Sequence, residues 1–176
     1  MLFVGSLIPR KGLPFLVEAA KKIVKEKVNT NFLVVGDGPL RNQLIDSLRA
    51  ANLLGNFLFM GNLKDDMLPA VYGCADVFVL PSIQEGQGIV LLEAQASGKP
   101  VVAFDITSNL EIIRQLTDKT GFLIPLPDIN KFSEQLKILA QDAALRIKLG
   151  INGRKRVEEK FQLNRIVKDI EAYLFE

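Results

Sequence analysis

The chain has 176 residues, of which 48% are hydrophobic and 24% charged, so it is long enough to bury the core of one globular domain. Its net charge of +2 is too small to indicate nucleic-acid binding, and with no visible signal peptide or apolar run of membrane-spanning length, the cytoplasm is the expected location. The single Cys74 excludes an internal disulfide framework, and the absence of histidine excludes histidine-based metal sites and Ser-His or Cys-His catalysis.

The first predicted element is a strand at residues 1–4, which a glycine-bounded loop at residues 5–12 follows. The next helix should begin near Pro14, and its apolar face consists of Leu16, Ala20 and Ile23. Because the chain opens directly on a strand, we expect residues 1–176 to be a single domain from which a preceding domain has been cut away.

A second strand is predicted at residues 32–35 and runs into Gly36-Asp37-Gly38-Pro39. A G-x-G after a strand is typical of a dinucleotide-binding turn, but the third glycine position is Arg41. The end of the next strand carries Gly61-Asn62 in place of an acidic residue. The sequence therefore excludes a nicotinamide cofactor.

The third strand, at residues 57–61, is predicted to be buried, and a short helix at residues 68–76 leads into the fourth. Asp65-Asp66 is the adjacent acidic pair between them, but it follows Lys64 and lacks the alternating Asp-x-Asp spacing of a metal site. We interpret the pair as a solvated turn and helix cap, and we expect no metal.

The most informative stretch begins with the continuous apolar run at residues 76–81, which is typical of a strand buried on both faces. The loop Glu85-Gly86-Gln87-Gly88 follows, then a helix at residues 91–96 that Gly98-Lys99-Pro100 ends. At the carboxyl end of a buried strand, the loop amides, the first N–H groups of the helix and its dipole suit a phosphate. The two loop glycines would let the phosphate come close.

Two carboxylates flank this loop, Glu85 before the glycines and Glu93 about one turn into the helix. An ionised carboxylate only accepts hydrogen bonds, and two adjacent sugar hydroxyls can both donate to one. The combination favours a nucleotide sugar, with its ribose at one glutamate and its hexose at the other. The alternative interpretation is a glycine-rich turn with a capping Glu85 and a solvated Glu93.

Strands are also predicted at residues 101–104 and 121–125, with a helix at residues 110–116 between them. Asp128 should cap a helix whose buried side consists of Phe132, Leu136 and Leu139. Residues 143–160 are predicted to be helical with an interruption near Gly150 to Gly153. Beyond them, the apolar stripe of the last helix consists of Ile166, Ile170, Tyr173 and Leu174.

Six strands alternating with helices predict an α/β fold, a doubly wound six-stranded parallel sheet with right-handed crossovers. Ligands of such sheets bind beyond the carboxyl ends of the strands. The loops at residues 5–12, 36–39 and 81–89 all lie there.

Here the chain resembles a known family on four motifs: Pro81-Ser82, Glu85-Gly86-Gln87-Gly88, Leu91-Leu92-Glu93-Ala94 and Ser97-Gly98-Lys99-Pro100-Val101-Val102-Ala103. They resemble the signature of the retaining glycosyltransferases of family four, in which seven residues separate two glutamates. That family has the two-domain, Rossmann-like GT-B architecture. The resemblance covers nearly the whole chain and implies that it is the C-terminal, nucleotide-sugar-binding domain, without its N-terminal acceptor domain.

The resemblance also implies roles for the first loop. Lys11 matches the lysine that grips the donor diphosphate, whereas Ser6 occupies the position of an arginine in the family. Arg10 is a candidate to compensate, because one hydroxyl replaces a guanidinium fork. The alternative is that Lys11 and Arg10 are solvated loop cations.

By the same resemblance, the leaving diphosphate is stabilised by Lys11 and by the amides of Gln87, Gly88 and Ile89. Glu93 would hold the ribose diol and Glu85 the hexose hydroxyls that orient the anomeric carbon. The backbone at Met60 would meet the nucleobase edge. Glu111 matches the acidic end of a family motif whose glycines are missing here.

The expected function is transfer of a hexosyl group from a UDP- or GDP-linked sugar to an acceptor in glycan biosynthesis, with retention of configuration and without metal or cofactor. We expect the isolated domain to be inactive, since the acceptor wall lies on the missing domain. The alternatives are a non-catalytic nucleotide-sugar sensor or regulatory module, and a sugar-nucleotide epimerase on the same fold.

Two surface features bear on possible partners. Arg154-Lys155-Arg156 is predicted to be a solvated face, with peripheral membrane association as the alternative. In the family the last helix crosses to the first domain, so the stripe at Ile166, Ile170 and Tyr173 would be left partly exposed and favour self-association.

Overall fold

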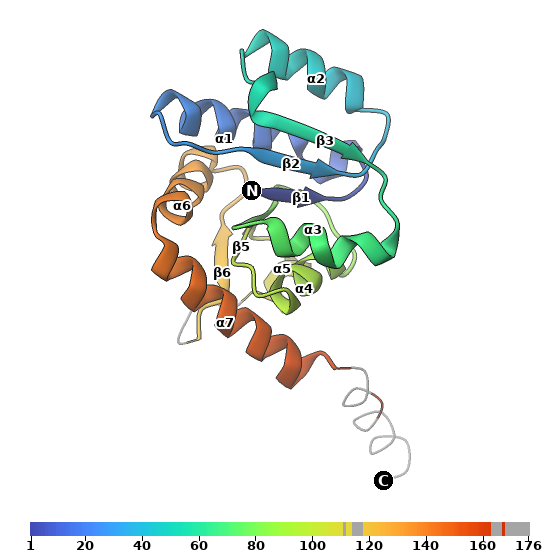
Figure 1. Cartoon of the computed structure of the whole chain (residues 1–176), viewed down its shortest axis with the longest axis vertical. Coiled ribbons are helices and arrows are strands. Elements are labelled where there is room, and N and C mark those ends of the chain that lie inside the picture. Colours follow the sequence, from blue (N-terminus) through green and yellow to red (C-terminus); the bar gives the residue numbers. More distant parts are fainter. Residues whose placement is uncertain (111, 114–117, 163–166, 168–176) are drawn as a thin grey trace.

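The computed structural model describes residues 1–110, 112–113, 118–162 and 167. These residues form one six-stranded, all-parallel sheet in the order β3-β2-β1-β4-β5-β6, which confirms the predicted doubly wound fold (Figure 1). The strands are β1 (Leu2–Val4), β2 (Phe32–Val35), β3 (Phe57–Gly61), β4 (Phe78–Leu80), β5 (Val101–Phe104) and β6 (Gly121–Ile124). The helices are α1 (Leu13–Lys25), α2 (Arg41–Ala50), α3 (Leu68–Cys74), α4 (Ile89–Ala96), α5 (Thr107–Leu110), α6 (Ile129–Gln141) and α7 (Ala143–Lys160).

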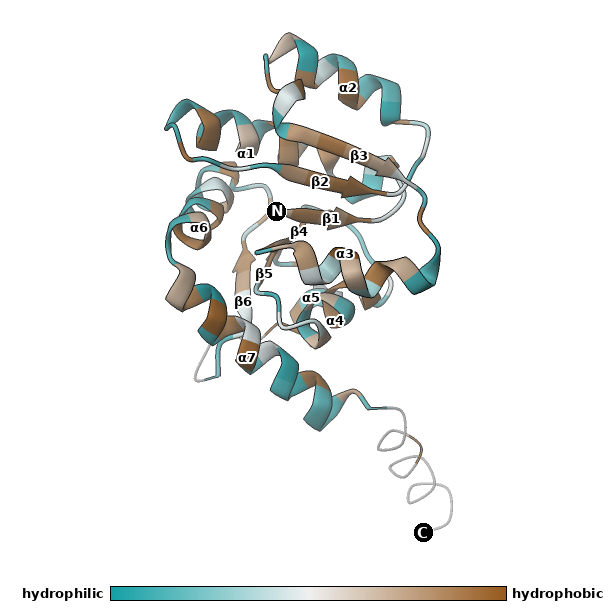
Figure 2. Ribbon diagram, in the orientation of Figure 1, coloured by the Kyte–Doolittle hydropathy of each residue, from teal (hydrophilic) through white to brown (hydrophobic). Residues whose placement is uncertain are grey.

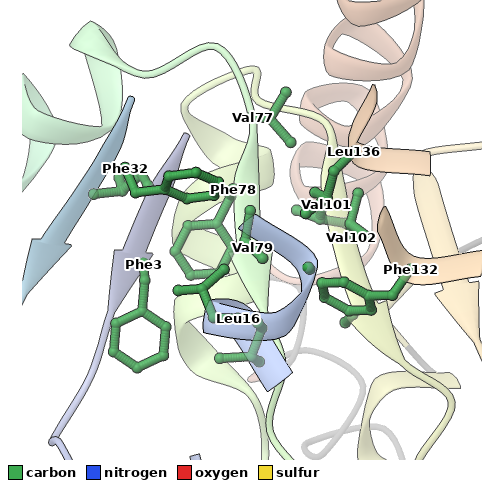
Figure 3. Close-up of a cluster of buried hydrophobic side chains, with 14 of the residues drawn as sticks. Phe3, Leu16, Phe32, Val77, Phe78, Val79, Val101, Val102, Phe132 and Leu136 are labelled. Carbon is green, nitrogen blue, oxygen red and sulfur yellow. The ribbon is translucent and has the colours of Figure 1, made fainter. Parts of the chain in front are cut away.

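Helices cover both faces of the sheet. On one face α1 packs between α2 and α6, and on the other α4 packs against α7 (Figure 1). Because both faces are covered, the central strands are apolar throughout, and the hydrophobic colour of Figure 2 gathers on the strands while the helices turn hydrophilic residues outward. Figure 3 shows Phe78 and Val79 of β4 within this core, with Leu16 of α1 and Phe132 of α6 beside them.

Two predicted helices are confirmed with their buried faces. In α1, Pro14 lies in the first turn, and Leu16, Ala20 and Ile23 are buried. In α6, the carboxylate of Asp128 accepts a hydrogen bond from the backbone N–H of Lys131 at 2.9 Å, as an N-cap should. The predicted buried side of α6, consisting of Phe132, Leu136 and Leu139, is fully buried.

The prediction that the third strand is buried was wrong for one of its faces. The side chains of Leu58 and Met60 are 61% and 40% exposed, whereas Phe57 is buried. The reason is topological, because β3 lies at the edge of the sheet and only one of its faces is packed.

The predicted interruption near Gly150 to Gly153 was also wrong, since α7 runs unbroken through both glycines. A Cβ atom at Gly150 would overlap the carbonyl oxygen of Gly98, and one at Gly153 would lie 3.1 Å from Cγ of Gln95. The glycines therefore serve close packing of α7 against α4, which offsets their cost of about 1 kcal/mol each in helix propensity.

Four other predictions changed or fall outside the description. The helix expected to begin at residue 110 was wrong in position, because α5 ends at Leu110 and residues 112–113 are not helical; residues 111 and 114–117 of that span are not among the described residues. Asp65-Asp66 lies exposed in a 3-10 helix, Asp65–Met67, without a side-chain cap hydrogen bond, so the cap prediction was wrong. Glu111 and the stripe at Ile166, Ile170, Tyr173 and Leu174 also lie outside the described residues.

Within the described part of the chain, no helix is long and apolar enough to cross a membrane.

Candidate functional site

The candidate site lies where the strand order reverses, between β1 and β4. The loops after these two strands touch backbone to backbone, because Ile83 N–H donates to the carbonyl oxygen of Arg10 at 2.9 Å. Gly12 has a φ of 64°, and a Cβ atom there would overlap the carbonyl oxygen of Pro81. Two distant segments of sequence therefore meet at the carboxyl end of the sheet, where ligands of such sheets bind.

The third predicted loop joins the same edge. Leu7 N–H donates to the carbonyl oxygen of Asp37 at 2.9 Å, and a Cβ atom on Gly36 would overlap the carbonyl oxygen of Gly5. The loops at residues 5–12, 36–39 and 81–89 are thus brought together, as the sequence predicted.

Lys11 and Glu85 form an ion pair between the loops after β1 and β4. The Lys11 ammonium lies 2.7 Å from Oε1 and 2.9 Å from Oε2 of Glu85. The two side chains are only 11% and 7% exposed. The structure therefore brings together the two residues to which sequence analysis gave catalytic roles, and it pairs them directly.

The loop before α4 reaches the helix through Gly88, which has a φ of 58° and caps the helix without a side-chain hydrogen bond. A Cβ atom at Gly88 would lie 3.2 Å from Cδ1 of Leu91 and 3.3 Å from Oδ1 of Asn109. Glycine is therefore required both by backbone conformation and by space. Leu91 N–H donates to the carbonyl oxygen of Gly88 at 2.8 Å. The N–H groups of Ile89 and Val90 precede this bond, and at these two positions an α-helix offers no acceptor of its own.

A pocket of about 490 Å³ adjoins the loop, with a polar edge and an apolar wall. It is lined by Glu85, Gly86, Gln87, Ile89, Leu92, Thr107, Ser108, Ile112 and Phe161. The buried hydroxyl oxygen of Ser108 has no hydrogen-bond partner within the described part of the chain. A polar rim facing an apolar wall suits a sugar ring, which presents hydroxyls at its edge and C–H groups on its faces.

Glu93 is held from the other side of α4 by a residue of α3. The hydroxyl group of Tyr72 donates to Oε2 of Glu93 at 2.6 Å, and the tyrosine is 2% exposed. Burial, together with the neighbouring carboxylate, raises the pKa of Tyr72 well above its ordinary value. Tyr72 therefore stays protonated and donates, which fixes one oxygen of Glu93 and leaves Oε1 available as an acceptor.

Sequence analysis missed Tyr72 and the hydroxyl of Ser108. A tyrosine in an otherwise apolar helix is a weak signal, since a buried phenol usually has a hydrogen-bond partner, but the partner cannot be read from the chain. Of the remaining predicted residues, Ser6 is exposed in the loop after β1. Met60 is half-exposed near the carboxyl end of β3.

Comparison with known proteins shows which family this chain is similar to. The family "Glycosyl transferases group 1" matches residues 1–156. The chain is 31% identical to the capsular polysaccharide biosynthesis glycosyltransferase CapM of Staphylococcus aureus, over 97% of this chain and 44% of that protein. It is 35% identical to UDP-Gal:alpha-D-GlcNAc-diphosphoundecaprenol alpha-1,3-galactosyltransferase of Escherichia coli, over 91% of this chain and 41% of that protein.

A solved structure of S. aureus TarM in complex with UDP superposes with a TM-score of 0.87 at 26% identity, over 95% of this chain and 34% of that chain. The chain thus spans less than half the length of these relatives. The family prediction is confirmed: the chain belongs to the group 1 glycosyl transferases and has the fold of the C-terminal domain of a GT-B glycosyltransferase.

Proposed function

We propose that this chain is the donor-binding domain of a retaining glycosyltransferase that takes a hexosyl group from a nucleoside diphosphate sugar without a metal ion. The observation that carries the proposal is the Lys11–Glu85 pair at the switch point of the sheet, because it sets a diphosphate-binding cation beside an acceptor for sugar hydroxyls. The UDP bound to TarM and the UDP-Gal donor in the name of the E. coli relative support it.

In this proposal the charge that develops on the leaving diphosphate is stabilised by Lys11 and by the N–H groups at residues 87–89. Such donors are effective because they are fixed before the reaction, and Lys11 is held by Glu85 with little exposure. Ser6 supplies one hydroxyl to the same diphosphate, and the backbone at Met60 meets the base.

The two glutamates then divide the donor between them. Glu85 lines the 490 Å³ pocket and accepts from the hydroxyls of the transferred hexose. Glu93 accepts from the ribose diol through Oε1, since Tyr72 occupies Oε2. The diphosphate lies between them, over the amino end of α4.

We further propose that residues 1–176 are one domain of a longer protein and transfer no sugar alone. Retaining transfer requires an acceptor hydroxyl held against the anomeric carbon with water excluded. The chain matches less than half of each relative, so a second domain is the expected source of that wall.

A non-catalytic nucleotide-sugar sensor is the second candidate, and Ser6 is the residue that favours it. A single hydroxyl replaces the family's guanidinium, which weakens stabilisation of a leaving diphosphate more than simple binding. Transfer of sugar by the full-length gene product would exclude the sensor.

The test is titration calorimetry of UDP and GDP with a chelator present. Binding by the wild type is expected, and Glu93→Ala should weaken it by about 1.5 to 3 kcal/mol, the cost of one charge-assisted hydrogen bond. Glu134→Ala, at an exposed position on α6, is the matched control and should leave affinity unchanged. Equal affinity of the wild type and Glu93→Ala would remove Glu93 from the site.

A further inference from the structure

We propose that the Lys11–Glu85 pair makes the site select the intact nucleoside diphosphate sugar over the nucleoside diphosphate that remains after transfer. The inference rests on the proposed function and concerns regulation of the same site. Its starting point is that the Lys11 ammonium and the Glu85 carboxylate are hydrogen-bonded to each other.

The pair is closed and shielded. Both carboxylate oxygens of Glu85 accept hydrogen bonds from the one ammonium of Lys11, at 2.7 and 2.9 Å. With side-chain exposures of 11% and 7%, water cannot easily take the place of either partner. Lys11 also runs past Gly5, since its Cε atom lies 3.4 Å from the position that a Cβ would take there.

A nucleoside diphosphate alone can satisfy only one half of this pair. If its phosphates take the hydrogen bonds of the Lys11 ammonium, Glu85 loses its cation while it is 7% exposed and faces a new anion. Leaving one partner of a shielded ion pair uncompensated is costly, and like charges in close proximity add to that cost. Glu85 therefore opposes the binding of a bare diphosphate.

The intact donor satisfies both halves. Its diphosphate engages Lys11, while the hexose attached to the terminal phosphate offers hydroxyl donors to the released carboxylate. The pocket that Glu85 lines is next to Gly86 and Ser108 and has a volume of about 490 Å³, so it can receive the sugar ring. The hydroxyl of Ser108, which has no hydrogen-bond partner among the described residues, is a further candidate contact for the ring.

The same pair also affects release of the diphosphate after transfer. When the hexose has left, Glu85 again lacks a donor, and reforming the Lys11–Glu85 pair competes with the remaining diphosphate for the ammonium. The carboxylate that helps to hold the donor thus also favours release of the product. Specificity of this kind comes from repulsion of the wrong ligand, here the diphosphate without its sugar.

The experiment compares UDP, UDP-glucose and UMP by titration calorimetry, with GDP, GDP-mannose and GMP in parallel. In the wild type the sugar nucleotide should bind about tenfold more tightly than the diphosphate. Glu85→Gln frees the Lys11 ammonium and should tighten diphosphate binding about tenfold, the equivalent of one charge-assisted hydrogen bond. It should leave the monophosphate within about twofold, because UMP and GMP lack the phosphate that reaches Lys11.

The matched control is Glu26→Gln, which also removes one acidic charge and breaks a Lys–Glu pair, but on the surface at Lys137, and should leave all affinities unchanged. Circular dichroism checks that each variant is folded. Unchanged or weaker diphosphate binding by Glu85→Gln would overturn the inference, and so would a wild type that prefers the diphosphate to the sugar nucleotide. If no nucleotide binds to the wild type or to any variant, the proposed function itself is wrong.

Discussion

The two glutamates of the site differ in the kind of partner that holds them. Glu85 is paired with a cation, the Lys11 ammonium, which neutralises its charge and occupies both of its oxygens. Glu93 is held by a neutral hydroxyl, that of Tyr72, which occupies one oxygen and leaves the charge intact. A neutral donor orients a carboxylate before the ligand arrives, whereas a charged partner makes the carboxylate available only when another anion takes the cation. The first arrangement pre-organises a contact, and the second makes it conditional.

The largest effect is expected from separating the two loops that carry the Lys11–Glu85 pair. Gly12→Val places a Cβ atom onto the carbonyl oxygen of Pro81 at a φ of 64°, so the free energy of unfolding should fall by more than about 3 kcal/mol in urea titrations. Gly86→Ala is the control, because no atom lies within 4 Å of the added methyl group, and it should change stability by less than about 0.5 kcal/mol. Equal midpoints and slopes for the two variants would mean that the loops are not in contact.

The next largest effect is expected from removing the hydrogen bond between Tyr72 and Glu93. Tyr72→Phe removes the 2.6 Å hydrogen bond while keeping the buried ring, and it should cost about 1.5 kcal/mol of stability. With Glu93 no longer oriented, the preference for UDP over its 2′,3′-dideoxy counterpart should shrink about threefold in calorimetry. Loss of stability with an unchanged ribose preference would reduce Tyr72 to a packing role.

The pH dependence of stability tests whether the phenol of Tyr72 is protonated in the folded protein. Because the pKa of Tyr72 is raised in the folded state above its ordinary value of 10.0, its contribution is complete below pH 10 and is lost as the pH rises toward the folded value. Between pH 9 and 11, unfolding of the wild type should become easier by about 1 kcal/mol more than that of Tyr72→Phe. Parallel curves for the two proteins would contradict burial of a protonated phenol.

The smallest effect is expected from adding a second cation to the loop that carries Lys11. Ser6→Arg adds a guanidinium fork from an exposed loop position and should tighten UDP binding about threefold while leaving UMP binding unchanged. Ser6→Lys adds the same charge without the fork, and it should have the weaker effect. An equal gain for UDP and UMP would show only a general attraction of anions.

The sequence predicted most of the architecture, because buried parallel strands and the loops after them are local patterns. It also placed Lys11 and Glu85 in one site, since both follow strands that end at the same edge. It could not predict that they pair, because that depends on the backbone contact between Gly12 and Pro81. Tyr72 was missed for a similar reason, as its partner lies on another helix.

The errors have a common physical origin. Exposure of β3 follows from strand order, which composition does not encode, so Met60 was assigned to a buried strand. In the sequence of a single helix, Gly150 and Gly153 indicate a break. In the structure they are the places where α4 and the turn after it approach α7 closely. Residues whose role is set by a distant neighbour are the ones that local pattern leaves undetermined.

The contact between Gly98 and Gly150 gives the domain a mechanical brace. Gly98 follows the carboxyl end of α4, and Gly150 fixes α7 against it with no room for a side chain. The opposite end of α4 begins after Gly88 and adjoins the loop that carries Glu85, so α7 is packed against the helix that positions this loop. A larger residue at Gly150 would push α7 away from Gly98, so its substitution is expected to disturb the loop that carries Glu85 from the far end of α4.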